Sequence, residues 1–173
     1  MDRAGQDRRH PTETGAGDRR EGRPERTGEP VAEESVTPDE IIRELHMQPH
    51  PEGGHYVQIH EDERVVDGRP VCTSIYFLLR AGEVSHWHRV DATEIWSYHA
   101  GEALELSIGE GGELRTVRLG PDLLSGERPQ GIVPAHAWQS ARPLGDWTLV
   151  GCVVAPGFRF SGFELAPAGW EPD

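Results

Sequence analysis

The most constraining feature of the sequence is a series of short β-like runs that fills the chain from residue 55 to residue 165. The runs are rich in Val, Ile, Thr, Tyr, Trp and Phe, and turn signals such as Asp67-Gly68 recur every eight to twelve residues. No helical pattern separates them, so the sequence predicts an all-β antiparallel sandwich or barrel. The predicted strands cover residues 55–60, 71–79, 84–90, 94–99, 104–108, 114–119, 131–133, 138–141, 148–154 and 160–165.

A short helix is predicted before these strands, over residues 36–47. Thr37 suits the N-cap and Pro38 the first helical position, and Glu40 completes a capping box. The segment 41–45 supplies an apolar stripe, so the helix is expected to dock on a sheet.

Residues 1–34 have a different composition, with seven Arg, nine Asp or Glu and almost no apolar side chains. A segment of this kind buries too little surface to offset the entropy of ordering it, so we predict a disordered tail. It also lacks the apolar run of a signal peptide or membrane anchor. The remainder, 35–173, is predicted to be one domain.

The net charge of residues 35–173 limits the classes of partner that we expect for this domain. Residues 35–173 carry ten Arg, no Lys and 21 Asp or Glu, a net charge of −11, which disfavours nucleic-acid binding. Cys72 and Cys152 lie far apart in apolar runs and suggest buried free thiols in a reducing cytosol. No stretch approaches the ~20 apolar residues that span a bilayer. We therefore expect a cytoplasmic protein with no nucleic-acid or membrane partner.

The segment 82–101 concentrates chemically active side chains within two predicted strands. His86 and His88 are two residues apart, so regular strand alternation would place them on one face, and a returning strand would bring Glu94 beside them. Imidazole and carboxylate groups arranged in this way can bind a divalent metal ion or form an acid/base pair.

The same segment resembles the first motif of the cupin superfamily, in which a glycine precedes two histidines one residue apart, a glutamate and a second glycine. The interval between Glu94 and Gly101 matches that motif. Two intervals differ: three residues separate Gly82 from His86, and five separate His88 from Glu94.

The second cupin motif contains a proline, a glycine and a histidine, and the segment 132–139 is similar to it. Here His136 stands in the place of the glycine and Gln139 in that of the histidine. A chelating histidine is thus replaced by an amide, and His136 is expected at the rim of the pocket or in solvent.

Five blocks in order resemble a small single-domain cupin family of unknown function whose members are described as predicted sugar epimerases. The blocks lie within residues 50–54, 73–79, 88–96, 133–139 and 155–158. The resemblance implies a double-stranded β-helix, or cupin jelly roll, with a pocket in the barrel mouth and a homodimeric assembly.

Two kinds of enzyme fit these residues. In the first, His86, His88 and Glu94, together with Gln139, hold one divalent metal ion, either Fe, Mn, Ni or Zn, as in an oxygenase or hydrolase. In the second, which works without metal, His88 removes a proton next to a carbonyl and Tyr76 or Tyr98 returns one.

We favour the isomerase or epimerase type, acting on a polar, carbonyl-bearing or sugar-like metabolite, and a non-catalytic ligand-binding cupin is the remaining alternative. Glu94 is expected to act with His88 in catalysis. The residues expected to contact the small-molecule ligand are His50, Glu52, Arg89, Trp96 and Gln139. Strand alternation predicts that Trp96 and Tyr98 share the face of Glu94, and that His99 points away.

Overall fold

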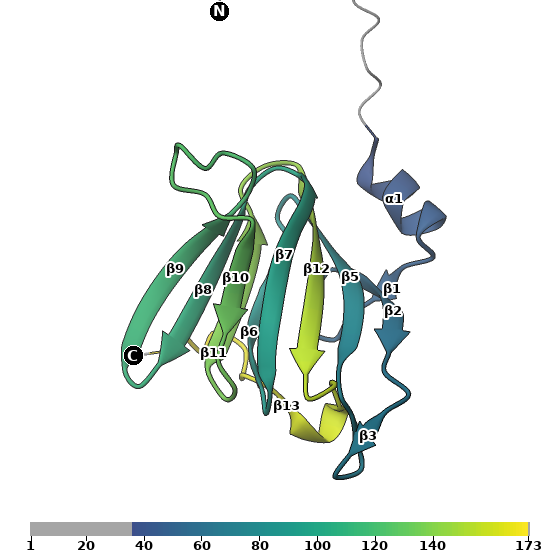
Figure 1. Cartoon of the computed structure of the whole chain (residues 1–173). Coiled ribbons are helices and arrows are strands. Elements are labelled where there is room, and N and C mark those ends of the chain that lie inside the picture. The colour runs from purple at the N-terminus through teal and green to yellow at the C-terminus, as the bar shows by residue number, and fades with distance from the viewer. Residues whose placement is uncertain (1–35, 173) are drawn as a thin grey trace, which may run out of the picture. The chain divides into compact units, whose positions relative to one another are not determined.

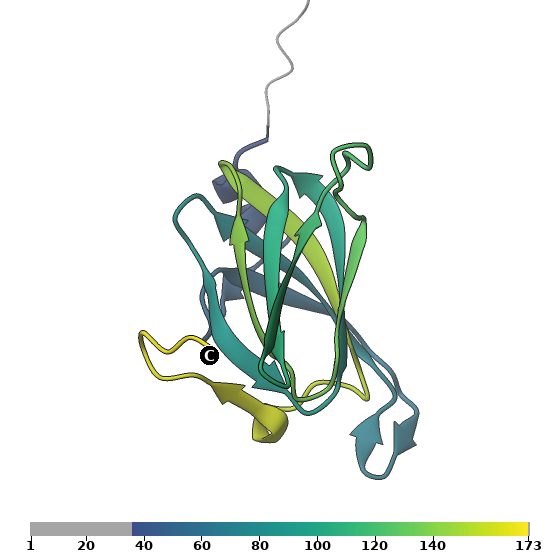
Figure 2. The same ribbon diagram turned by 90° about the vertical axis from the view of Figure 1, so that its left-hand side faces the viewer.

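The computed structural model describes residues 36–172, and the tail predicted for residues 1–34 lies outside them. The described chain forms two antiparallel sheets that face each other, together with a small two-stranded hairpin (Figures 1 and 2). The six-stranded sheet has the order β1 (Gln48–Pro49), β2 (His55–Glu61), β5 (Thr73–Arg80), β12 (Trp147–Ala155), β7 (Thr93–Gly101) and β10 (Gln130–Val133). The five-stranded sheet has the order β13 (Phe163–Leu165), β6 (Ser85–Val90), β11 (Trp138–Pro143), β8 (Leu104–Glu110) and β9 (Glu113–Leu119). This arrangement confirms the predicted jelly roll.

Each predicted strand overlaps an observed one, and the main departure is the segment 160–165. There a 3₁₀ turn, η1 (Phe160–Gly162), precedes the strand β13. At this turn Gly162 lies directly against the Asp91 side chain. The separate hairpin of β3 (Val65–Val66) and β4 (Arg69–Pro70) surrounds the turn predicted at Asp67-Gly68.

The N-terminal helix, α1 (Pro38–Glu44), is shorter than predicted. Thr37 caps it and Glu40 completes the capping box as expected, but the chain leaves the helix at Leu45, and His46 takes a positive φ of 54°. Ile41 anchors α1 in a cluster with Met47 and Leu78 of β5. None of the helices within residues 36–172 is long and apolar enough to cross a membrane.

Replacing Thr37 with Ala should lower the free energy of unfolding by about 1 kcal/mol, the usual loss for an N-cap. The substitution removes the side chain that accepts the Glu40 N–H bond and leaves that donor to water. Urea denaturation of both proteins measures the difference, with Thr37→Ser as the control that keeps the cap. An unchanged midpoint for Thr37→Ala would show that the cap does not hold the helix.

The inner faces of the two sheets share one apolar core. Strand alternation selects its members, which include Phe77, Leu79, Trp96, Leu106, Ile108 and Val150. Near the start of β7 and the end of β12 the interior is no longer purely apolar, because polar side chains are buried there. They include Glu52, Ser85, His88, Glu94 and Gln139. This polar end of the barrel positions the candidate site.

Glu52 reaches the barrel through the connection between β1 and β2, which passes close to two strands. Gly53 has a φ of +112°, and a Cβ there would collide with the Val84 carbonyl oxygen. Gly54 has a φ of +69° and lies against the Leu78 carbonyl. Glycine is required at both positions because the backbone is left-handed and has no space for a side chain. The two glycines therefore let the loop approach closely enough for the Glu52 side chain to lie inside the barrel.

Candidate active site

A pocket with a volume of about 80 Å³ opens at the polar end of the barrel. One part of its wall is polar and includes His50, Glu52, Tyr56, His88, Glu94 and Cys152. The other part is apolar and includes Ile75, Phe77, Val90, Phe158, Phe160 and Phe163. A small molecule with both polar and apolar parts would fit such a wall.

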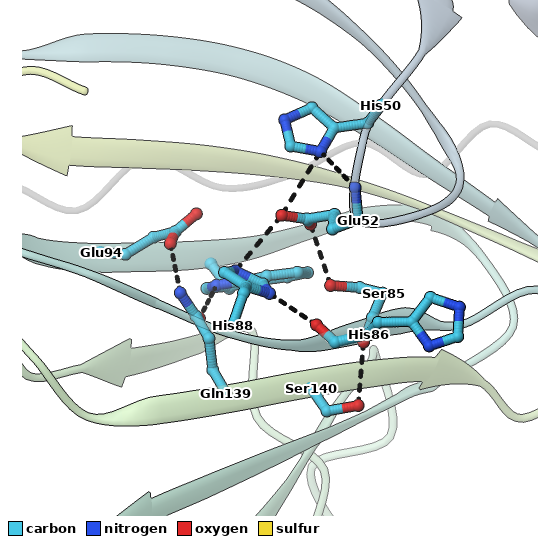
Figure 3. Close-up of polar contacts among 9 residues, drawn as sticks. His50, Glu52, Ser85, His86, His88, Glu94, Gln139 and Ser140 are labelled. Carbon is cyan, nitrogen blue, oxygen red and sulfur yellow. Dashed lines mark hydrogen bonds and ion pairs between the residues drawn. The ribbon is translucent and has the colours of Figure 1, made fainter. Parts of the chain in front are cut away.

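Glu52 stands between two imidazole rings (Figure 3). Its Oε2 lies 3.3 Å from Nε2 of His88 and 3.4 Å from Nδ1 of His50. Its Oε1 accepts a 2.9 Å hydrogen bond from the Ser85 hydroxyl. Burial raises the pKa of Glu52 to about 8, although the Ser85 hydrogen bond opposes the rise. Glu52 is therefore mostly a neutral acid at pH 7.

The proton positions on the two rings follow from their other partners. Nδ1 of His88 lies 2.8 Å from the His86 carbonyl oxygen, which only accepts, so Nδ1 carries the proton and Nε2 presents a lone pair to Glu52. The Glu52 backbone N–H donates to Nδ1 of His50 at 3.3 Å, so the lone pair of this nitrogen is used in that bond. The Nε2 lone pair of His88 faces Oε2 of Glu52 and favours a proton on that oxygen, in agreement with the raised pKa of Glu52.

Both rings are held neutral. Burial lowers the pKa of His88, although Glu94 opposes the change. Burial, together with the neighbouring His88, lowers the pKa of His50 to about 4. At neutral pH both imidazoles are therefore uncharged, and their free ring nitrogens accept hydrogen bonds.

Glu94 lies in the same pocket and is held by a second chain of hydrogen bonds. Nε1 of Trp96 donates to Oε1 of Gln139 at 2.9 Å, and Nε2 of Gln139 donates to Oε2 of Glu94 at 2.6 Å. Because indole nitrogen only donates, Trp96 fixes the orientation of the Gln139 amide. Burial raises the pKa of Glu94 to about 7, with His88 opposing the rise and Glu52 adding to it. Glu94 can therefore gain or lose a proton near neutral pH.

The described fold and pocket can be compared with known proteins. The model of the family described as Cupin superfamily (DUF985) matches residues 39–166. This chain belongs to the DUF985 family of cupins. The family has no established function, and no curated protein is significantly similar to this cupin in sequence.

Solved structures support the same placement. Protein SO0799 from Shewanella oneidensis is 44% identical, with a TM-score of 0.73 over 76% of this cupin and 85% of that chain. A hypothetical protein from Leishmania major is 31% identical, with a TM-score of 0.71 over 76% of this cupin and 88% of that chain. A dTDP sugar isomerase from Desulfovibrio desulfuricans G20 is 19% identical, with a TM-score of 0.50 over 68% of this cupin and 83% of that chain. The likeness to the isomerase is one of fold alone.

The expected convergence of His86 and His88 is wrong, because strand β6 of this cupin is irregular. Gln139 pairs with His88 and Ala141 with Ser85, so two residues of β6 face the single residue Ser140 of β11. The bulge turns His86 to the exposed side and places Ser85 and His88 inside (Figure 3). His86 therefore lies outside the pocket.

Three other predicted residues also lie outside the pocket. Tyr76 is on the opposite face of β5, in the cluster that holds Ile41. Tyr98 shares the inner face of β7 with Glu94, but it lies four residues further, about 13 Å along the strand, and its hydroxyl donates to the Gly101 carbonyl. Arg89 points outward, where it pairs with Glu164 at 2.6 Å.

Of the other predicted site residues, four line the cavity, whereas two that were expected to contact the ligand do not. His50, Glu52, His88 and Glu94 line it, and Trp96 and Gln139 lie behind Glu94. His99 and His136 are exposed, as expected.

Sequence reasoning missed the apolar wall of the pocket and several polar residues of the pocket region, including Tyr56, Cys152 and Ser85. Tyr56 and Cys152 line the cavity, and the Cys152 thiol hydrogen-bonds to Glu94. The pair Gly53-Gly54 could have indicated Tyr56, because β2 begins directly after these glycines. The inward position of Ser85 could not be predicted, because it depends on the bulge in β6.

The four predicted metal ligands do not fit a metal site in this cupin. His86 points away, and Oε1 of Gln139 already accepts the Trp96 N–H bond. Within residues 36–172, the group of His, Cys, Asp or Glu side chains with ligand atoms within 4.8 Å of one another is His60, Asp62 and Cys72. This possible metal-binding group lies at the ends of β2 and β5, outside the pocket, and both Asp62 carboxylate oxygens accept hydrogen bonds from Arg64.

The buried acid Glu52 should make stability fall as the pH rises. The folded state keeps the Glu52 proton up to a pH of about 8, whereas the unfolded chain loses it near 4.5. Unfolding therefore releases a proton across this window, and stability declines by up to about 1.4 kcal/mol per pH unit. Glu52→Gln should remove this contribution. Urea denaturation from pH 5 to 8 measures both slopes, and equal slopes would show that Glu52 is ionised in the folded protein.

Proposed function

We propose that this cupin is an isomerase- or epimerase-type enzyme that moves a proton on a small, carbonyl-bearing metabolite. The observation that carries the proposal is the presence of two buried carboxyl groups, Glu52 and Glu94, in one cavity with the lone pair of His88.

The proposed reaction needs one base and one acid. Glu94, with a pKa of about 7, takes the proton from the carbon next to the carbonyl, and the electron pair of that C–H bond forms an enol. Glu52 donates its proton to the carbonyl oxygen. Before this transfer Nε2 of His88, 3.3 Å from Oε2 of Glu52, accepts a hydrogen bond from the same proton. In a hydroxycarbonyl substrate, Glu94 then gives its proton to the former carbonyl carbon, and the hydroxyl group on the carbon that lost its proton gives its own proton to Glu52. The carbonyl group thus moves by one carbon with no net change in protons or electrons.

The residue proposed as the general acid differs from the one in the sequence-based hypothesis. Tyr76 and Tyr98 were the expected acids, but neither lines the cavity, and Glu52 takes that role in the proposal. The metal-dependent alternative is not pursued because its four ligands are not assembled. The dTDP sugar isomerase shares the fold, which supports the proposal only in showing that this architecture can host an isomerase.

Hydrogen–deuterium exchange tests the proposal without a known substrate. Aldoses, ketoses, hydroxyketones and aldehydes, both neutral and phosphorylated, are incubated with the protein in D₂O at pH 7, and proton NMR follows the signal of the α-proton. At least one compound should exchange faster than in buffer. His88→Ala should abolish the acceleration, and His86→Ala, its exposed neighbour, should retain it. No acceleration with any compound, or full acceleration in His88→Ala, would refute the proposal.

A further inference from the structure

We infer that the substrate of this pocket is an uncharged carbonyl compound with an apolar ring, and that phosphorylated or carboxylated metabolites are excluded. The inference rests on the proposed function and narrows it to a class of substrate. Two features carry it: the charges around the cavity and the aromatic wall at its mouth.

The cavity contains acids but no fixed cation. Glu52 and Glu94 line it, no Arg occurs among the described residues of its wall, and the chain has no Lys. Phosphate and carboxylate groups are normally bound by Arg, Lys or a helix N-terminus. An anion here would lose its hydration and meet Glu94 without gaining a partner.

The arginines beside the pocket are already paired. Arg69 donates to the Gly157 carbonyl and lies 2.7 Å from Asp91, and Arg159 lies 2.9 Å from the second oxygen of Asp91. The Asp91 carboxylate thus pairs with two guanidinium groups next to the segment that carries Phe158. Neither side chain belongs to the wall of the cavity.

The apolar side of the mouth is formed by three phenylalanines. Phe158 lies 5.1 Å from Phe160 and 6.0 Å from Phe163, measured between ring centroids. Phe160 remains 61% exposed although it lines the pocket. An exposed ring at a cavity entrance gains contacts when a flat apolar group lies against it. The polar head of the substrate would then reach Glu52 and Glu94.

The test compares neutral ligands with anions of the same shape, using the full chain at pH 7. The probes are phenylacetamide with phenylacetate, cyclohexanecarboxamide with cyclohexanecarboxylate, and thymidine diphosphate. Two-dimensional ¹H–¹⁵N NMR titrations give the affinity and locate the site. At least one amide should bind in the pocket at least about tenfold more tightly than its carboxylate, and thymidine diphosphate should not shift pocket signals. Equal or tighter pocket binding of the anions, or pocket binding by neither amide, would overturn the inference.

Two variants probe the two features separately. Phe160→Ala should weaken amide binding about three- to tenfold, because it removes the ring at the mouth. Gln58→Arg places a cation on an exposed residue of the wall and should strengthen carboxylate binding, whereas Gln130→Arg, which adds the same charge outside the cavity, should not. No response to Phe160→Ala and Gln58→Arg would contradict the assignment of this mouth as the ligand site.

The failure of this inference can be distinguished from the failure of the proposed function. If a phosphorylated compound undergoes exchange that depends on His88, the proposed proton transfer is supported, but the inference that the substrate is uncharged is wrong. If the amides bind in the pocket but no compound exchanges, the ligand class stands and the isomerase proposal fails.

Discussion

Glu94→Gln is expected to lower the rate of α-proton exchange by about 10²- to 10⁴-fold, the usual contribution of a general base. An amide of nearly the same size cannot take up the proton, but its oxygen can still accept the bond that Gln139 now donates to Glu94. The fold should therefore be retained. The exchange rate of the best compound from the D₂O screen, together with a thermal melt, measures both properties.

The matched control for this variant is Glu164→Gln, which changes an exposed carboxylate that pairs with Arg89 on the outside of the barrel. It should exchange at the wild-type rate. Wild-type activity in Glu94→Gln would remove Glu94 from the reaction, and equal losses in both variants would point to the overall charge of the protein.

Trp96→Ala is expected to lower the free energy of unfolding by about 3–5 kcal/mol, because a large cavity would open in the core. Trp96 is 1% exposed and its ring meets Phe77 edge-on, with centroids 5.7 Å apart. Trp96→Phe should cost less, but it leaves Oε1 of Gln139 without its donor, at about 1–3 kcal/mol. Urea denaturation of the three proteins tests this order.

The indole N–H also orients Gln139, so the two variants should differ at the site. Trp96→Phe frees the amide to rotate and should shift the pKa of Glu94, whereas Trp138→Phe, on the other face of Gln139's strand, should not. If Trp96→Phe changes neither stability nor the Glu94 titration, the orienting hydrogen bond is not formed in solution.

The regular parts of the fold were predictable because strand period and capping chemistry are local. Glu94 and Trp96 face inward by simple alternation, and Thr37 caps α1 as its position indicates. The bulge in β6 depends on how this strand pairs with β11, which no local pattern records. A slip of one residue was enough to exchange His86 for Ser85 inside the barrel.

The position of Glu52 shows a second limit. Its partners His88 and Ser85 are more than thirty residues further along the chain, and the contact arises because Gly53 and Gly54 let the loop approach the barrel. The family resemblance singled out residues 50–54, but only the packed structure shows that the Glu52 carboxyl group is buried between the rings of His50 and His88. The predicted homodimer, cytoplasmic location and tail remain predictions.

The most direct measurement is a pH titration by carbon NMR of the glutamate carboxyl groups, with Glu52→Gln and Glu94→Gln used to assign the two pocket signals. Glu94 should titrate at about pH 7 and Glu52 at about pH 8, well above the ordinary value of 4.5. That result would establish a pocket that holds and exchanges protons at neutral pH. If both groups titrate near 4.5, Glu52 is ionised at pH 7 and cannot be the acid, which contradicts the proposed chemistry.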